Sequence, residues 1–548
     1  MKRNKEIVIS FYSTAFFLLF LILSSCKAHK EYQEPSAKNT HGIIPLPTSV
    51  DFQEGFFTLN RNVVFSGSDS FPSATKIVTA ALNLALTGGY SSKSNAAGPE
   101  IRFVSDTGIP DEGYKLVISA KGITISAGKA AGAFYASQSL RQMIWNLTLG
   151  QKQESIKLPL VSITDAPKYG WRGFHIDVAR HFFTKEYIMK TIDWLALYKF
   201  NKLQIHLTDD QGWRIQIDQF PLLTEKGAWR TFNNYDSACM KKSESDSRYQ
   251  IDSRFIKVVD GKTVYGGFYT KQDINEIVKH ASDNFIEVIP EIDMPGHMSA
   301  AISAYPFLSC TGTAGWGTEF SYPICPCNEE SMKFCYKVWD EVAALFPSSL
   351  VHIGCDEVEK GTWEASSDCQ KYMSANNLSG VNAIQNNFVV LLQKYLENKG
   401  KKVIAWDDVI DGNVDKDLVL MYWRDWVGDS PVRGAKNGNS LIFTPWTLFY
   451  LSGDNSDAAL KNQYEYDASS IFNSQVMTKI TGFQGCVWTE DIPSEAVFEY
   501  MVYPRLQALS ETEWSKGKDW SSFRMRLKTH LQYMTAMHIG YREPNLNL

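Results

Sequence analysis

The sequence lacks several features that would place it in a special class of protein. It has no low-complexity run and no internal repeat, and 44% of its 548 residues are hydrophobic against 21% charged, which excludes disorder. Basic residues are not in excess, because the formal net charge is −5, so we expect no nucleic-acid partner. What remains is a globular chain with enough material for two or three domains.

Paired metal-ligand motifs are also missing. Cys325-Pro326-Cys327 is the nearest approach to one, but no second Cys or His pair stands at zinc-like spacing around it. We therefore expect no metal and no cofactor. Eight cysteines follow Cys26 in the sequence, and we expect a disulfide from Cys310 to either Cys325 or Cys327.

The one long apolar run, near the N-terminus, is too short to cross a membrane. Ala15 to Leu23 falls short of the roughly 20 apolar residues that a span needs, and basic residues precede it as in an export signal. Leu23-Ser24-Ser25-Cys26 resembles a bacterial lipobox, which favours a lipoprotein over the alternative of a transmembrane anchor. We expect residues 1–26 to be a lipoprotein signal peptide with Cys26 lipidated, and residues 27–41 to be a polar tether.

A lipid on Cys26 would attach the chain to a membrane, so we expect an exported lipoprotein whose partner is that membrane. Lys27 does not resemble an inner-membrane retention signal, so we expect the outer membrane, with the periplasmic or surface face left open.

Residues 42–165 have the pattern of a small α+β domain. Tyr114 to Ala127 alternates between apolar and polar residues around Lys121-Gly122, which predicts a β-hairpin. Ala131 to Ile144 has helical spacing of its apolar residues. No residue in this part indicates catalysis.

Residues 166–515 change to apolar strands that alternate with amphipathic helices. The predicted strands are 173–179, 202–208, 287–293, 350–357, 403–408, 419–423, 441–444 and 482–488, and the clearest helices are 185–200, 271–285, 332–346, 382–398 and 495–514. Eight strands in this rhythm predict an α/β fold, a (β/α)8 TIM barrel, although little helical pattern separates the sixth and seventh strands. Residues 516–548 are expected to be a C-terminal helical segment that packs on the barrel.

Polar residues gather where these strands end, which is where a barrel builds its active site. They are Asp177, Arg180, His206, Asp209, Asp210, Glu291, Asp293, His297, Asp356, Glu357, Trp406, Asp407, Asp408, Trp488 and Glu490. Neighbours in a regular strand point to opposite faces, so Asp356 and Glu357 can share a pocket only if their strand ends there. Such an adjacent pair does not offer the two separated carboxylates of a conventional double displacement.

The motifs around these residues resemble one family. His352-Ile353-Gly354-Cys355-Asp356-Glu357 is similar to the His-Ile-Gly-Gly-Asp-Glu signature of glycoside hydrolase family 20, the β-N-acetylhexosaminidases. Further matches follow in family order: Trp171-Arg172-Gly173, Asp177-Val178-Ala179-Arg180-His181, His206 to Trp213, Pro290 to His297, Ala405-Trp406-Asp407 and Cys486 to Glu490. The resemblance covers about residues 42–515.

This resemblance implies a retaining, substrate-assisted hydrolysis of terminal β-linked N-acetylglucosamine or N-acetylgalactosamine from a glycan. It implies that Glu357 is the general acid and base and that Asp356 orients the acetamido group of the substrate, which is the nucleophile. Tyr450 matches the tyrosine that steadies the acetamido oxygen, and His297 with Asp209 matches a pair that sets the pKa of the acid. The residues that match sugar contacts are Arg172, Trp406, Trp423, Trp488 and Glu490.

Two positions depart from the family pattern. Cys355 replaces the second glycine of the signature, and any side chain there needs a backbone conformation that glycine would not have constrained. Tyr450-Leu451-Ser452 replaces a Tyr-Leu-Asp sequence, and losing that carboxylate favours tolerance of an anionic substituent such as a sulfate.

Three other interpretations are compatible with parts of the pattern. A glycan-binding protein that lost catalysis would not need the acid pair. A conventional retaining glycosidase would use Asp408 or Glu490 as its nucleophile. A metal-dependent hydrolase would need ligand spacing that the His and Asp residues lack. The natural glycan, the sugar series and the oligomeric state are left open.

Overall fold

The computed structural model describes residues 42–91 and 98–546. The predicted signal peptide, Cys26 and the tether lie outside these residues. Among the described helices, none is both long enough and apolar enough to cross a membrane.

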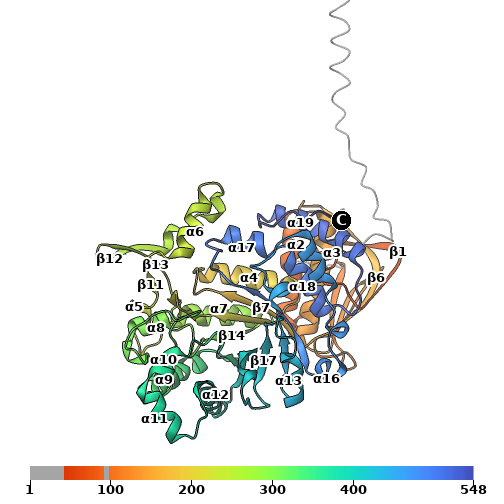
Figure 1. Ribbon diagram of the computed structural model, residues 1–548. Coiled ribbons are helices and arrows are strands. Elements are labelled where there is room, and N and C mark those ends of the chain that lie inside the picture. The colour runs from red at the N-terminus through yellow and green to blue at the C-terminus, as the bar shows by residue number, and fades with distance from the viewer. Residues whose placement is uncertain (1–41, 92–97, 547–548) are drawn as a thin grey trace, which may run out of the picture. The chain divides into compact units, whose positions relative to one another are not determined.

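The first part of the described chain is a six-stranded sheet with two helices (Figure 1). The strands follow the order β1-β6-β4-β5-β3-β2, and their bounds are β1 Ser49–Asn60, β2 Val64–Ser66, β3 Glu100–Ser105, β4 Tyr114–Ser119, β5 Gly122–Ala127 and β6 Ser155–Asp165. The predicted hairpin is confirmed, because β4 and β5 pair antiparallel and Ser119 lies opposite Gly122. Helices α2 (Pro72–Ala85) and α3 (Ala130–Thr148) pack against each other. The second is longer than predicted.

The predicted TIM barrel is confirmed. Eight parallel strands close in the order β14-β15-β16-β17-β18-β19-β7-β8. Their bounds are β7 Trp171–Asp177, β8 Lys202–His206, β14 Glu287–Glu291, β15 Leu350–His352, β16 Lys402–Trp406, β17 Val419–Tyr422, β18 Leu441–Phe443 and β19 Ile480–Val487. Every strand is buried at most of its positions, as expected for a parallel sheet that is covered by helices.

Helices alternate with these strands, and one prediction was wrong in detail. The main helices are α4 Lys185–Leu197, α7 Lys271–Asp283, α9 Glu329–Leu345, α12 Val381–Glu397, α13 Ser430–Asn437, α17 Glu495–Val502 and α18 Arg505–Trp514. The predicted single helix 495–514 is two helices, because Pro504 has no N–H to donate and disfavours a helical residue before it. The short α13 supplies the helix between the sixth and seventh strands.

The loops carry the shorter elements. These are β9 Thr208–Asp209, β10 Gly212–Trp213, α5 Leu222–Glu225, β11 Trp229–Arg230, α6 Asn234–Ser243, β12 Ile256–Val259, β13 Lys262–Gly266, α8 Ser299–Ala304, α10 Gly361–Ala365, α11 Ser367–Ala375, α14 Trp446–Phe449, α15 Asp457–Glu465 and α16 Ser474–Met477. Of the two disulfides considered from the sequence, the structure has Cys310–Cys325, in the loop before α9.

The C-terminal helix α19 (Trp520–Ala536) holds the start of the described chain. Arg526 forms a buried ion pair with Glu511 of α18 and donates to the carbonyl oxygen of Ile43 at 2.8 Å. His530 Nε2 lies 2.7 Å from the carbonyl oxygen of Gly42. The helix therefore joins the barrel to the residues that lead into the sheet.

Candidate active site

A cavity of about 290 Å³ opens at the carboxyl ends of the barrel strands. It is lined by Arg180, Asp356, Glu357, Trp423, Trp446, Tyr450, Ser452, Gly453, Trp488 and Glu490. These residues follow β7, β15, β17, β18 and β19, at the end of the barrel where TIM-barrel active sites are built. A larger cavity, about 860 Å³, lies along α19, but a single carboxylate, Glu543, lines it.

Asp356 and Glu357 both face this cavity because the preceding strand ends early. β15 stops at His352, and the backbone then enters the left-handed region at Gly354 (φ 68°), at Cys355 (φ 78°) and again at Glu357 (φ 52°). Neighbours in a regular strand would have pointed to opposite faces. The irregular turn is what allows two adjacent carboxylates to share one cavity.

Contacts with the loop after β14 hold this turn in place. A Cβ atom at Gly354 would lie 1.7 Å from Oδ1 of Asp293, so only glycine fits there. The same carboxylate accepts the N–H of Cys355 at 3.1 Å, and the buried Cys355 thiol donates to the carbonyl oxygen of Met294 at 3.0 Å. A non-glycine residue at this φ costs about 1–3 kcal/mol, so these contacts stabilise a strained backbone beside the acid pair.

His297 connects the acid pair to a buried carboxylate behind it. Its Nε2 atom lies 3.5 Å from Oε2 of Glu357 and 3.7 Å from Oδ2 of Asp356, while its Nδ1 atom lies 3.4 Å from Oδ1 of Asp209. Burial alone would favour the neutral imidazole, but the charge of Asp209 and the nearby carboxylates of Asp210 and Glu357 raise the pKa of His297 well above its usual value. A protonated His297 therefore faces both carboxylates.

The pKa values of the carboxyl groups around His297 are shifted in opposite directions. Burial favours the protonated form of each group. It raises the pKa of Asp356, with Glu357 adding to the rise, and it raises the pKa of Asp293 well above the usual value, with Asp356 adding to it. Asp209 is equally buried, yet the positive charges of Arg180 and His297 hold the pKa of its carboxyl group well below the usual range. The site thus separates an ionised carboxylate from carboxyl groups that bind protons more readily.

Aromatic rings form the walls of the cavity. The rings of Trp423 and Tyr450 are stacked at 6.2 Å, and the Trp488 ring lies 6.0 Å from Tyr450. Burial raises the pKa of Tyr450 well above its usual value, so its hydroxyl keeps its proton and can donate a hydrogen bond. Trp406 is absent from the lining: its ring is buried behind Trp488 and its N–H donates to Glu291 at 2.9 Å.

The predicted sugar contact by Arg172 was wrong. Arg172 is the second residue of β7 and lies at the amino end of that strand, away from the cavity. Its guanidinium group binds Glu112 at 2.6 Å and donates to the carbonyl oxygens of Lys199 and Tyr169. Arg172 is therefore a buried structural residue between the barrel and the N-terminal sheet.

The arginine in the cavity is Arg180, which the sequence placed at a strand end without assigning it a role. It lies 2.8 Å from Asp209, 3.2 Å from Asp177 and 3.5 Å from Glu490. Its guanidinium carbon also lies 4.9 Å from the Trp488 ring centre. Three carboxylates and one ring thus fix its position.

Trp446 and Ser452 complete the lining. Trp446 begins α14 directly after the seventh strand and is 52% exposed, which its position after a strand end could have indicated. The Ser452 hydroxyl accepts the N–H of Trp488 at 3.3 Å and leaves this part of the cavity without the charge of the family carboxylate. Tolerance of an anionic substituent stays a prediction.

Asp408 lies next to the cavity but not in its lining. It accepts the indole N–H of Trp423 at 2.7 Å and lies 3.6 Å from Arg424. Burial raises the pKa of Asp408 to about 7.

The fold also gathers His and carboxylate groups that are far apart in the sequence. Asp293, His297 and Asp356 offer atoms within 4.8 Å of one another, as do His206, Asp209 and Asp293. Sequence spacing did not reveal these groups, and the expectation of no metal stays a prediction.

Comparisons with known proteins agree with this geometry. Residues 169–517 match the glycosyl hydrolase family 20 catalytic domain, and residues 40–166 match domain 2 of the same family. A β-hexosaminidase of Porphyromonas gingivalis is 33% identical over 96% of this chain and 67% of its own length. A β-hexosaminidase of Vibrio furnissii is 30% identical over 86% of this chain and 76% of its own.

Solved structures of the same family have the same architecture. An exo-β-N-acetylglucosaminidase of Vibrio harveyi in complex with N-acetylglucosamine is 30% identical, with a TM-score of 0.80 over 93% of this chain and 80% of its own. The N-acetyl-β-hexosaminidase of Streptomyces plicatus is 28% identical, with a TM-score of 0.76 over 94% of this chain and 99% of its own. The chain therefore belongs to glycosyl hydrolase family 20 and is a glycoside hydrolase.

Proposed function

We propose that this enzyme removes terminal β-linked N-acetylhexosamine residues from glycans by a retaining mechanism in which the acetamido group of the substrate is the nucleophile. One observation carries the proposal: Asp356 and Glu357, adjacent in the chain, face one cavity together with Tyr450. Adjacent carboxylates cannot flank a sugar ring from opposite sides, but they can act on two neighbouring groups of one substrate. The catalytic activities of the named relatives agree with this assignment.

The first step breaks the glycosidic bond. Glu357 donates a proton to the glycosidic oxygen, the bond from that oxygen to C1 breaks, and the acetamido oxygen forms a bond to C1. Asp356 accepts the acetamido N–H, and the Tyr450 hydroxyl donates to the acetamido oxygen. Since the nucleophile is already part of the substrate, the protein needs only to hold it in position.

The second step opens the bicyclic intermediate. Glu357, now ionised, takes a proton from a water molecule. The water oxygen attacks C1, and the bond between C1 and the acetamido oxygen breaks. Two displacements restore the β configuration. The protonated His297 stabilises the carboxylate forms of Asp356 and Glu357, which it faces at 3.7 and 3.5 Å.

Arg180 and Glu490 hold the hydroxyl groups of the terminal sugar. An arginine fork suits paired oxygens, and the adjacent carboxylate accepts hydroxyl protons. A cavity of about 290 Å³ closed by these two residues and by Tyr450, Trp423 and Trp488 supports an exo action on one terminal residue.

The mechanism is tested by asking which molecule supplies the nucleophile. We expect thiazoline analogues of the bicyclic intermediate to bind wild type far more tightly than substrate, and Asp356→Asn to weaken this binding and slow the first step by about 2–4 kcal/mol. Glu359→Gln is the control, because its carboxylate accepts the N–H of Thr318 outside the cavity. A covalent sugar adduct on Asp408 or Glu490, or equal turnover of glucosides without the acetamido group, would refute substrate assistance.

A second proposal concerns location: the enzyme is an exported lipoprotein held at the outer membrane through Cys26. The sequence Leu23-Ser24-Ser25-Cys26 supports it. Cys26→Ala should abolish incorporation of a fatty-acid analogue during growth and release the enzyme from the membrane fraction. Continued labelling of the substituted protein would contradict the proposal.

A further inference from the structure

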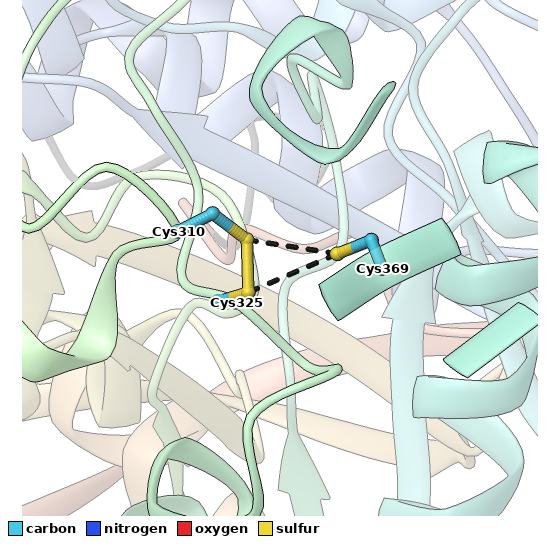
Figure 2. Close-up of side chains that lie close together, drawn as sticks. All are labelled: Cys310, Cys325 and Cys369. Carbon is cyan, nitrogen blue, oxygen red and sulfur yellow. Dashed lines mark hydrogen bonds between the residues drawn. A yellow bond between two sulfur atoms is a disulfide. The ribbon is translucent and has the colours of Figure 1, made fainter. Parts of the chain in front are cut away.

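Three sulfur atoms lie together where the loop before α9 meets α11 (Figure 2). Cys310 and Cys325 form a disulfide, and Sγ of Cys369 lies 3.6 Å from Sγ of Cys310 and 3.8 Å from Sγ of Cys325. Figure 2 shows the Cys369 sulfur beside the disulfide bond, facing both of its atoms. The proposed glycoside cleavage uses none of these groups.

Cys369 has the surroundings of a nucleophilic thiol. It lies in the first turn of α11, where its own N–H is capped by Ser366, and a helix N-terminus stabilises a thiolate. A hydrogen bond with the thiol of Cys327 lowers the pKa of Cys369, whereas burial raises the pKa of Cys335 and Cys355. Cys369 is thus more readily ionised than those two thiols.

The position of Cys369 restricts what it can react with. Its side chain is fully buried against Trp363 and Ile384, so reagents in solution do not reach it easily. A disulfide, by contrast, is already in contact with it. A thiolate attacks a disulfide directly, and the reaction needs no other participant.

We propose that Cys369 is the attacking thiol of an internal thiol–disulfide exchange site, in which the disulfide moves between Cys310–Cys325 and Cys310–Cys369. The Cys369 thiolate turns from its side-on position, forms a bond to Sγ of Cys310, and the bond from Cys310 to Cys325 breaks. Cys325 leaves with the electron pair and takes up a proton. One disulfide and one thiol are present before and after, so no oxidant or reductant is consumed.

The exchange changes which segments are covalently joined. Cys310–Cys325 spans 15 residues within one loop, whereas Cys310–Cys369 spans 59 residues and encloses α9, β15 and the acid pair. The loop that carries Cys310 and Cys325 already touches the active-site loops, because Ile324 donates to the carbonyl oxygen of Pro295 and Thr318 donates to Glu359. The second linkage would enclose the loop after β15, which carries the acid pair, in one covalent ring.

The direct test maps the disulfides of the full-length protein. Folded wild type is held at pH 8 without added thiol, denatured rapidly in N-ethylmaleimide, digested without reduction and analysed by mass spectrometry. We expect Cys310–Cys369 peptides beside Cys310–Cys325 peptides, none in Cys369→Ser, and several-fold slower exchange in Cys327→Ser, which loses the thiol beside Cys369. Cys310–Cys325 alone at every time point, with Cys369 fully alkylated, would overturn the proposal.

A second variant tests whether Cys310 and Cys369 can be joined, whatever the rate of exchange in wild type. In Cys325→Ser, Cys310 has lost its partner, and incubation with glutathione disulfide should join it to Cys369, because the two sulfur atoms lie 3.6 Å apart. Cys335→Ser, which removes a buried thiol in α9, is the control and should keep Cys310–Cys325. Activity on an aryl N-acetylglucosaminide confirms that each variant is folded. Folded Cys325→Ser with Cys310 and Cys369 both alkylated would overturn the proposal.

Discussion

At the scale of single residues, the chemistry depends on one proton donor. We expect Glu357→Gln to lower kcat on a disaccharide by about 10²–10⁴-fold, because its leaving group must be protonated, and to lower it less on nitrophenyl glycosides. Glu359→Gln is the control, since that carboxylate accepts N–H groups of the neighbouring loop outside the cavity. Steady-state rates on both substrates check this. An equal loss on the two would remove Glu357 from its role as acid.

His297 predicts a pH dependence of stability. Its pKa is raised in the folded protein above the value of about 6.5 that it has when unfolded, so its contribution is complete below about pH 6.5 and is lost as pH rises through the folded pKa. In that window the free energy of unfolding of wild type should fall by up to ~1.4 kcal/mol per pH unit more steeply than that of His297→Gln. Urea unfolding from pH 6 to 9 measures the two slopes.

A histidine outside the site provides the comparison. His280 also pairs with a carboxylate, Asp193, at 2.8 Å, but the pair is partly exposed and solvent screens it. His280→Gln should therefore change the slope much less than His297→Gln. Parallel curves for wild type and His297→Gln would show that His297 is neutral in the folded protein.

At the scale of elements, the sequence predicted where strands begin better than where they end. The start of β15 at Leu350 was predicted correctly, but its end at His352 lies five residues before the predicted end. Apolar spacing does not reveal the left-handed backbone of Gly354, Cys355 and Glu357. That local backbone turns both carboxylates into the cavity, so the residues of the acid pair could be predicted while the geometry that joins them could not.

The wrong assignment of Arg172 has a related cause. The predicted strand 173–179 already placed Arg172 at the amino end, where a barrel does not build its active site. The resemblance of Trp171-Arg172-Gly173 to a family motif favoured Arg172 in spite of this position. Arg180 follows the carboxyl end of the same predicted strand, where an active-site arginine is expected. The cysteine cluster was missed for a different reason: Cys369 is 59 residues from Cys310, and only tertiary contacts bring them together.

Cys355 allows a measurement of strain in this turn. Both Cys355→Gly and Cys355→Ala lose the thiol contact with Met294, but a φ of 78° suits glycine, whereas alanine keeps the strain. We expect Cys355→Gly to be more stable than Cys355→Ala by about 1 kcal/mol, the reverse of their order in a helix. Denaturant unfolding of the two variants gives the difference. An alanine variant of equal or greater stability would show that this backbone is not strained.

At the scale of the whole molecule, buried polar contacts join the N-terminal sheet to the barrel. Lys199 Nζ lies 3.1 Å from Oδ2 of Asp165, which also accepts the hydroxyl of Tyr114 at 2.7 Å. Arg172 and Glu112 form a second connection across the same boundary. The sheet contributes no residue to the lining of the cavity, and these contacts hold it against the barrel.

Arg172 in β7 and Arg180 in the loop after it are expected to affect different properties, the first stability and the second substrate binding. Arg172→Lys should lower the free energy of unfolding by about 2–4 kcal/mol, because a buried fork loses its paired contacts, and leave KM unchanged. Arg180→Lys should raise KM by about tenfold, since a charge-assisted contact to substrate is lost. Denaturant unfolding and steady-state kinetics measure both quantities. A raised KM in Arg172→Lys would return this residue to substrate binding.

The contacts of α19 with Gly42 and Ile43 have a mechanical consequence. If the chain is held at a membrane by residues that precede Gly42, any pull enters the fold through a backbone held by Arg526 and His530. Both contacts are buried, and Glu511 of α18 accepts the N–H of Leu46 as well. The force is therefore shared between α19 and the barrel before it reaches β1. A force applied at Gly42 would therefore act on these contacts before it acts on β1, the edge strand of the sheet.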